Sequence, residues 1–127
     1  MNTTAEEILS LIINLEYLLK NADSTKFDIK MRVLHLIKNN EKTTPNLIID
    51  KLGMARSNLA IMCNKLSKEG LISKHKDILN KKEIYYTLTQ KGLEQLEETY
   101  NKAESNFLKH RNKTKLKKLS NDLKKLI

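Results

Sequence analysis

Apolar residues recur every three or four positions along most of this chain, which is the spacing of one covered face of an α-helix. The first such segment begins at Thr4, and Thr4 with Glu7 has the spacing of a helix capping box. Its apolar stripe is wider than one covered face needs, so we expect contacts both within its own subunit and with a second subunit. The expected dimerisation residues in this helix are Ile8, Leu11, Ile12 and Leu15.

Two helices separated by a tight turn are predicted in the middle of the chain. After a helix over about residues 26–38, Thr44 can cap a third helix that has Pro45 at its first position. Gly53 can adopt the left-handed conformation of the turn that follows. A fourth helix then covers about residues 55–69.

A β-hairpin is predicted directly after the fourth helix. Residues 71–76 and 82–88 alternate between apolar and polar side chains, as strands with one covered face do. The tip between them carries Ile78 and Leu79, which we expect to fold back on the domain; contact with a minor groove or a partner is the alternative. Helix, turn, helix and hairpin in this order indicate a winged helix-turn-helix, a module that usually holds one helix in the DNA major groove.

A long helix capped by Thr89 and a short terminal helix complete the predicted fold. Leucines at 3-4-3 spacing give the terminal helix an apolar seam, and a helix of this length needs a partner. We therefore predict a mainly α fold with a small hairpin in one domain, residues 1–127. Residues 26–92 form the DNA-binding part, and residues 1–24 and 93–127 form dimerisation helices. The leucine seam consists of Leu116, Leu119, Leu123 and Leu126.

The helix over residues 55–69 divides into an apolar and a polar face. Leu59, Met62, Cys63 and Leu66 share one side and should pack inward. The opposite side mixes Arg, Ser, Asn and Lys, which hydrogen-bond to base edges and phosphates; an ordinary solvated face is the alternative. The expected DNA contacts in this helix are Arg56, Ser57, Asn58, Ile61, Asn64 and Lys65.

The net charge of +9 is concentrated in two segments. Residues 51–82 carry +6 and residues 109–127 carry +7, whereas residues 1–50 carry −1 and residues 83–108 carry −3. The first cationic segment is the predicted recognition helix and hairpin, which favours a polyanionic partner over a merely lysine-rich protein. The cationic tail fits either a dimerisation helix with solvated lysines or a second DNA contact. Further DNA contacts are expected at Thr44, Asn46, Lys74, Lys76, Asn80, Lys81 and Lys82.

Other classes of protein have little support in the sequence. Cys63 is the sole cysteine, and its place in an apolar stripe suits a core residue in a reducing cytoplasm. His35, His75 and His110 have no spacing that suits a metal site. We find no phosphate-binding loop and no nucleophile–base pair, so we expect no enzyme and no cofactor. With no membrane span and no signal peptide in the sequence, the predicted location is the cytoplasm.

Short motifs follow one another in a fixed order through residues 44–92. They are Thr44-Pro45, Ile48-Ile49, Leu52-Gly53, Arg56-Ser57-Asn58-Leu59, Lys65-Leu66, Glu69-Gly70-Leu71-Ile72, Leu88-Thr89 and Lys91-Gly92. This order resembles the MarR family of transcription regulators. The long helices that flank the segment match the family architecture, so the resemblance covers nearly the whole chain.

This resemblance implies a homodimer that is clasped by its terminal helices. Such a dimer binds double-stranded DNA at a pseudo-palindromic operator as a repressor or activator, and we expect repression. The resemblance often also implies release by a small-molecule effector held between the two lobes.

The chain departs from the family pattern at two places. Asn80-Lys81-Lys82 stands where the family has Asp-Arg-Arg, and lysine lacks the bidentate fork of arginine. Ile61 stands where an arginine is frequent, so one direct contact is either absent or replaced by an apolar contact with a thymine methyl group. Two other functions stay open: a plasmid or phage partition protein that binds centromere-like repeats, and a winged helix that contacts only proteins.

Overall fold

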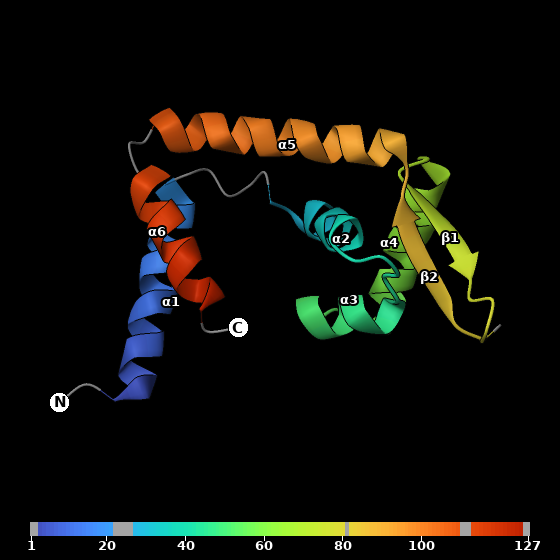
Figure 1. The fold of residues 1–127 in the computed structure, drawn as a ribbon, viewed down its shortest axis with the longest axis horizontal. Coiled ribbons are helices and arrows are strands. Elements are labelled where there is room, and N and C mark those ends of the chain that lie inside the picture. Colours follow the sequence, from blue (N-terminus) through green and yellow to red (C-terminus); the bar gives the residue numbers. More distant parts are fainter. Residues whose placement is uncertain (1–2, 22–26, 81, 110–112, 126–127) are drawn as a thin grey trace. The chain divides into compact units, whose positions relative to one another are not determined.

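The computed structural model describes residues 3–21, 27–80, 82–109 and 113–125 (Figure 1). These residues form mainly helices with one two-stranded hairpin, as the sequence predicted. Two compact units are present, one over Phe27–Thr99 and one that combines Met1–Lys26 with Tyr100–Ile127. The elements are α1 (Thr4–Asn21), α2 (Ile29–Lys38), α3 (Pro45–Leu52), α4 (Arg56–Lys68), β1 (Ile72–Lys76), β2 (Ile84–Leu88), α5 (Gln90–Lys109) and α6 (Lys113–Lys124).

Short polar side chains fix where α2 and α3 begin. Asp28 has an extended backbone, and its Oδ1 accepts a hydrogen bond from the Met31 N–H at 2.9 Å. The α2 helix therefore begins at residue 29, later than the predicted residue 26. Thr44 Oγ1 accepts from the Leu47 N–H at 3.2 Å, and Pro45 occupies the first position of α3, as expected. Gly53 follows with φ +65°, the left-handed conformation predicted for the turn.

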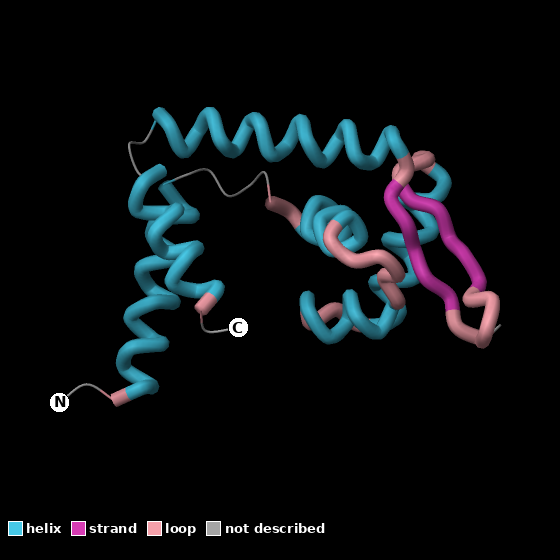
Figure 2. The backbone as a smooth tube through the Cα atoms, in the orientation of Figure 1, coloured by secondary structure: helices cyan, strands magenta, loops and turns pink. Residues whose placement is uncertain are grey.

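The hairpin pairs β1 and β2 in antiparallel register, with residue 72 opposite residue 88 and residue 76 opposite residue 84. Both strands are one or two residues shorter at their starts than predicted. An additional bridge joins the hairpin to the start of α3, because the Tyr86 N–H donates to the Thr43 carbonyl at 2.8 Å. Thr43 is completely buried, and this hydrogen bond connects the wing to the helix-turn-helix. Figure 2 shows the two strands of the hairpin beside the helices of this unit.

The core of the unit over residues 27–99 lies among α2, α3, α4 and the inner face of the hairpin. The contacts α2 with β2, α4 with β1, α3 with α4 and α2 with α3 enclose it. Burying one of its leucine or isoleucine side chains stabilises the fold by roughly 1.5–3 kcal/mol relative to leaving it exposed. Its fully or nearly fully buried apolar residues are Val33, Leu34, Ile37, Ile48, Leu59, Cys63, Leu66, Leu71, Ile72, Tyr86 and Leu96.

A compact set of hydrogen bonds joins the end of α4 to the start of α5. Thr89 Oγ1 donates to the Gly70 carbonyl at 2.6 Å and accepts from the Gly92 N–H at 3.0 Å, which confirms Thr89 as the cap. Lys91 Nζ donates to the Glu69 carbonyl at 2.8 Å. The hairpin therefore starts and ends at one bonded junction.

The second compact unit contains α1, the later part of α5, and α6. Its capping box lies one residue earlier than predicted: Thr3 Oγ1 accepts from the Glu6 N–H at 3.2 Å, and Glu6 Oε2 accepts from the Thr3 N–H at 3.3 Å. Leu123 of α6 is half-buried. The side chains of Leu116 and Leu119, and all of Leu126, lie outside the described part of the chain.

Candidate nucleic-acid interface

The two faces of α4 differ in burial as the sequence predicted. Leu59, Cys63 and Leu66 are at most 2% exposed, and Met62 is half-buried beside them. Every predicted contact residue of this helix is exposed, and none of them contributes to the core. The exposed set is Arg56, Ser57, Asn58, Ile61, Asn64 and Lys65. The helix can therefore lay this exposed face, which is polar except for Ile61, against a partner without disturbing its packing.

The N-terminus of α4 has no side-chain cap. The residue at the cap position is Ala55, which has no oxygen to accept a hydrogen bond from the first-turn amides. Exposed Arg56 and Ser57 stand at the same helix end. Free amides at the positive end of a helix dipole bind phosphate readily, so this end suits an anionic ligand.

An exposed hydrogen bond links the starts of α3 and α4. Arg56 Nη2 donates to Asn46 Oδ1 at 2.7 Å, which orients the guanidinium and leaves its other N–H groups to donate elsewhere. Thr44 is half-buried, and its hydroxyl oxygen already caps α3. The structure thus brings three predicted contact residues from two helices to one place.

A hollow of about 280 Å³ lies where these helix starts meet the base of the wing. Arg56, Asn46 and Thr44 line one part of it, and Lys82, Glu83 and Ile84 line another. Residues far apart in the sequence therefore form one continuous surface. Arg56 and Lys82 outweigh Glu83 in charge, so the hollow is net cationic and suits an anionic phosphate backbone.

The lysines of β1 lie on the hairpin face that is directed toward α4. Lys74 is paired with Tyr86 and Lys76 with Ile84 across the hairpin, so both lysines share the face of these inward residues. Both lysines are exposed. Lys74 also lies close enough to Cys63 of α4 to act on its thiol electrostatically. The positive charge of the wing is thus next to α4.

The tip of the wing differs from the prediction. Ile78 and Leu79 do not fold back on the domain but are 89% and 96% exposed. Asn80 has a structural part in the loop, since its Oδ1 accepts from the Lys82 N–H at 3.3 Å. Lys81, also predicted to contact DNA, lies outside the described residues.

Lys42, which was not among the predicted contact residues, lies against the Tyr85 face of the wing, opposite the face that carries Lys74 and Lys76. Its Nζ lies 3.6 Å from Asp77 Oδ2 and 5.3 Å from the centre of the Tyr85 ring. The His75 ring stacks on the Tyr85 ring, with 5.0 Å between the two ring centres. A lysine in a polar turn gives no periodic signal, and only the bridge at Thr43 brings it against the wing.

Cys63 and Tyr86 form a buried polar contact behind the interface. Burial raises the pKa of the Tyr86 hydroxyl to about 12, and the neighbouring Cys63 adds to this rise. Burial also raises the pKa of the Cys63 thiol, although a hydrogen bond from Tyr86 and the charge of Lys74 oppose the rise. A protonated, buried thiol is a poor nucleophile, so Cys63 is a core residue.

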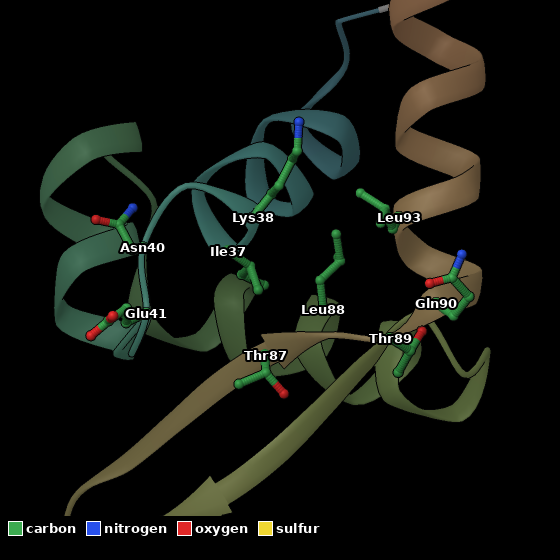
Figure 3. A pocket seen from close by; sticks show the side chains of 9 residues that line it. All are labelled: Ile37, Lys38, Asn40, Glu41, Thr87, Leu88, Thr89, Gln90 and Leu93. Atoms are coloured by element: carbon green, nitrogen blue, oxygen red, sulfur yellow. The ribbon is translucent and has the colours of Figure 1, made fainter.

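A second hollow of about 270 Å³ lies between the end of α2, the start of α5 and the end of β2 (Figure 3). Ile37, Leu88 and Leu93 are its apolar residues, and Asn40 and Gln90 are among its polar ones. Pockets that hold small-molecule ligands usually measure roughly 300–1,000 Å³, so we assign no effector to this hollow.

The described residues offer neither a metal site nor a membrane span. These residues contain no group of three or more His, Cys, Asp and Glu side chains that could hold a metal ion. No helix among them combines the length and apolarity that a membrane span requires.

Comparison with solved structures finds the same fold in transcription regulators. The Multiple Antibiotic Resistance Repressor, MarR, is 19% identical with a TM-score of 0.71, over 100% of this chain and 96% of that chain. The transcriptional regulator BldR from Sulfolobus solfataricus is 16% identical with a TM-score of 0.66, over 99% and 100%. The transcriptional regulator Tm0710 from Thermotoga maritima is 22% identical with a TM-score of 0.62, over 95% and 89%.

Sequence comparisons complete the assignment. A comparison with curated proteins gave no significant match. The family described as winged helix DNA-binding domain matches residues 29–108, which include all of α2 to β2 and nearly all of α5. The order of the elements, the exposed face of α4 and this family match all indicate a winged helix. The chain belongs to the winged helix DNA-binding domain family and has the fold of MarR-type regulators.

Proposed function

We propose that this protein is a homodimeric, MarR-type transcription regulator that represses by binding a pseudo-palindromic operator in double-stranded DNA. The observation that carries the proposal is the exposed face of α4, which stands beside the cationic wing and the hollow at the starts of α3 and α4. A face of this composition on a winged helix suits base edges and phosphates.

In the proposed complex each subunit places α4 in a major groove. Arg56 and Asn58 donate to base edges near the start of the helix, and Ile61, which is 69% exposed, contacts a thymine methyl group. The uncapped end of α4 holds a phosphate. Lys74, Lys76 and Lys82 neutralise the adjacent backbone, so binding weakens steeply as salt is added.

The apolar surface of α1 supports the dimer. Ile8 and Ile12 are 49% and 46% exposed, and Leu11 and Leu15 beside them are half-buried. An apolar helix face that is left this open in a single chain is stabilised when a second copy covers it. Two-fold symmetry then places the two α4 helices on half-sites about one helical turn apart.

The test selects duplexes from a random-sequence library with the full-length protein and measures their affinity by fluorescence anisotropy. Arg56→Ala should weaken the selected duplex by about 1–3 kcal/mol and relax the preference at one base position. Lys65→Ala should weaken all duplexes alike and lower the salt slope by about 1. The control Lys30→Ala removes the same charge from α2, where it breaks only a surface ion pair with Glu69 at 3.6 Å, and should bind like wild type.

The outcomes separate the proposal from its rivals. Selected duplexes with two related half-sites, bound by one dimer, support a regulator. Cooperative filling of clustered repeats would indicate a partition protein instead. A monomer in sedimentation, or no duplex binding at low salt, would refute the proposal.

A further inference from the structure

Two aliphatic side chains project from the tip of the wing. Ile78 is 89% exposed and Leu79 is 96% exposed, more than any other large apolar residue in the described part of the chain. The two residues are adjacent, and neither belongs to the core or to the exposed face of α4. Exposing an apolar pair to water at a loop tip is unfavourable, so we expect that these side chains contact a binding partner.

The loop that carries them is closed by its own polar groups. Asp77 Oδ1 accepts from the Leu79 N–H at 2.9 Å and from the Asn80 N–H at 3.3 Å. The Glu83 N–H donates to the Asn80 carbonyl at 2.9 Å, and the Asp77 N–H donates to the Glu83 carbonyl at 3.0 Å. These bonds hold the backbone while the two aliphatic side chains point outward.

Lysines flank the apolar pair on both strands, and the same loop carries two carboxylates, Glu83 and Asp77, of which Asp77 has its Oδ2 3.6 Å from Lys42 Nζ. Lys76 ends β1 and Lys82 precedes β2, and both side chains are exposed. Lys82 also lines the hollow that contains Arg56, so the tip continues the proposed DNA interface. An apolar point between lysines complements a groove in which stacked bases lie between two rows of phosphates.

We propose that Ile78 and Leu79 form an apolar wedge that enters the minor groove and partly unstacks a base step. The inference rests on the proposed function and extends it to bases that α4 does not reach. Inserted isoleucine and leucine side chains kink duplexes in this way. T-A steps open most easily, and the N2 amino group of guanine obstructs the groove floor, so the wedge favours A·T pairs there.

The test compares two alternating polymers, poly(dI-dC) and poly(dG-dC). They present the same major-groove groups, but only guanine carries the N2 amino group in the minor groove. A duplex with a donor dye at one end and an acceptor dye at the other reports a kink at a central T-A step as a rise in acceptor fluorescence, and it adds no amino group to the minor groove. Full-length wild type should prefer poly(dI-dC) by about tenfold and should raise the fluorescence.

Four variants make the test specific to the wedge. The double variant Ile78→Ser with Leu79→Ser should lose both the preference and the fluorescence rise, whereas the Met pair at the same positions should keep them. The double variant Ile78→Lys with Leu79→Lys should bind duplexes more tightly at low salt without unstacking them. Ile29→Ser removes an exposed apolar side chain from α2 and should behave like wild type.

Failure of the wedge and failure of the proposed function give different results. A wild type that binds both polymers alike, with steep salt dependence, overturns the wedge and leaves the regulator intact. A Ser pair that keeps the preference, or that dissociates the dimer, also overturns the wedge. A wild type that binds neither polymer at low salt overturns both proposals.

Discussion

Replacing Gly92 with alanine tests the junction between the wing and α5. Gly92 is buried in the first turn of α5, and an added Cβ would overlap the Leu71 carbonyl oxygen. It would also lie 2.9 Å from Leu88 Cδ1 and 3.1 Å from the Leu71 carbonyl carbon. The leucine side chain can rotate away, but the carbonyl accepts the Thr89 N–H at 3.1 Å and leads directly into β1. The backbone itself must therefore move.

Opposing effects set the size of the change. Alanine favours a helix over glycine by about 1 kcal/mol. Overpacking against fixed atoms costs about 1–3 kcal/mol, and more when backbone must shift. Loss of the hydrogen bond between Thr89 and Leu71 removes roughly 1 kcal/mol more. We expect Gly92→Ala to lower the free energy of unfolding by about 2–3 kcal/mol, because steric overlap outweighs helix propensity.

Urea unfolding followed by far-ultraviolet circular dichroism measures this change, at one protein concentration because association shifts apparent stability. Gly53→Ala is the matched control. A Cβ at Gly53 meets nothing within 4 Å, so alanine there carries only the left-handed strain of φ +65°, about 1–2 kcal/mol. A Gly92→Ala protein as stable as wild type, or more stable than Gly53→Ala, would refute the steric argument.

A substitution at Thr44 tests the cap of α3, and an alkaline titration tests the buried Tyr86. Thr44→Ala removes the acceptor of the Leu47 N–H and should lower the free energy of unfolding by about 1 kcal/mol in urea, whereas Thr44→Ser should stay near wild type. Tyr86 has a folded pKa raised from 10.0 to about 12, so the stability that its neutral form contributes is complete below pH 10 and is lost as pH rises through 12. Tyrosine absorbance during an alkaline titration should show Tyr86 ionising late, and Tyr86→Phe should remove that late step.

The helix-turn-helix was predictable because its signals are local. Thr44 and Pro45 define a helix start by their own chemistry, and Gly53 defines the turn by its backbone freedom. The division of α4 into faces follows from helical spacing alone. These features depend on neighbours a few residues away and need no knowledge of the tertiary structure.

The surface around the wing was less predictable because it depends on distant contacts. Thr43 pairs with Tyr86, and this bridge brings Lys42 to Asp77. No pattern in the polar turn over residues 39–42 indicates either contact. The bridge forms because a buried backbone N–H on β2 requires an acceptor, and the segment before α3 passes that point.

The predicted position of the wing tip was wrong for a related reason. Ile78 and Leu79 were expected to be buried against the domain, as large apolar residues usually are. Asp77 and Asn80 satisfy the backbone of the loop locally, so the tip extends without support from the domain. The capping box of α1 illustrates a different ambiguity: Thr3 with Glu6 and Thr4 with Glu7 have equal spacing, and only the structure shows which pair bonds.

The composition of the interface also explains why one α4 is insufficient for the proposed function. Specific DNA binding exceeds nonspecific binding by about 4–10 kcal/mol, and one good bidentate contact supplies about 1–3 kcal/mol. The exposed face of α4 holds a single arginine, Arg56, with Asn58 and Asn64 as further donors. The wing contributes lysines, which act on phosphates and distinguish sequences little. A single copy therefore reaches the lower end of the required range, whereas two copies on paired half-sites double the discrimination, which is why covering α1 with a second chain bears directly on sequence specificity.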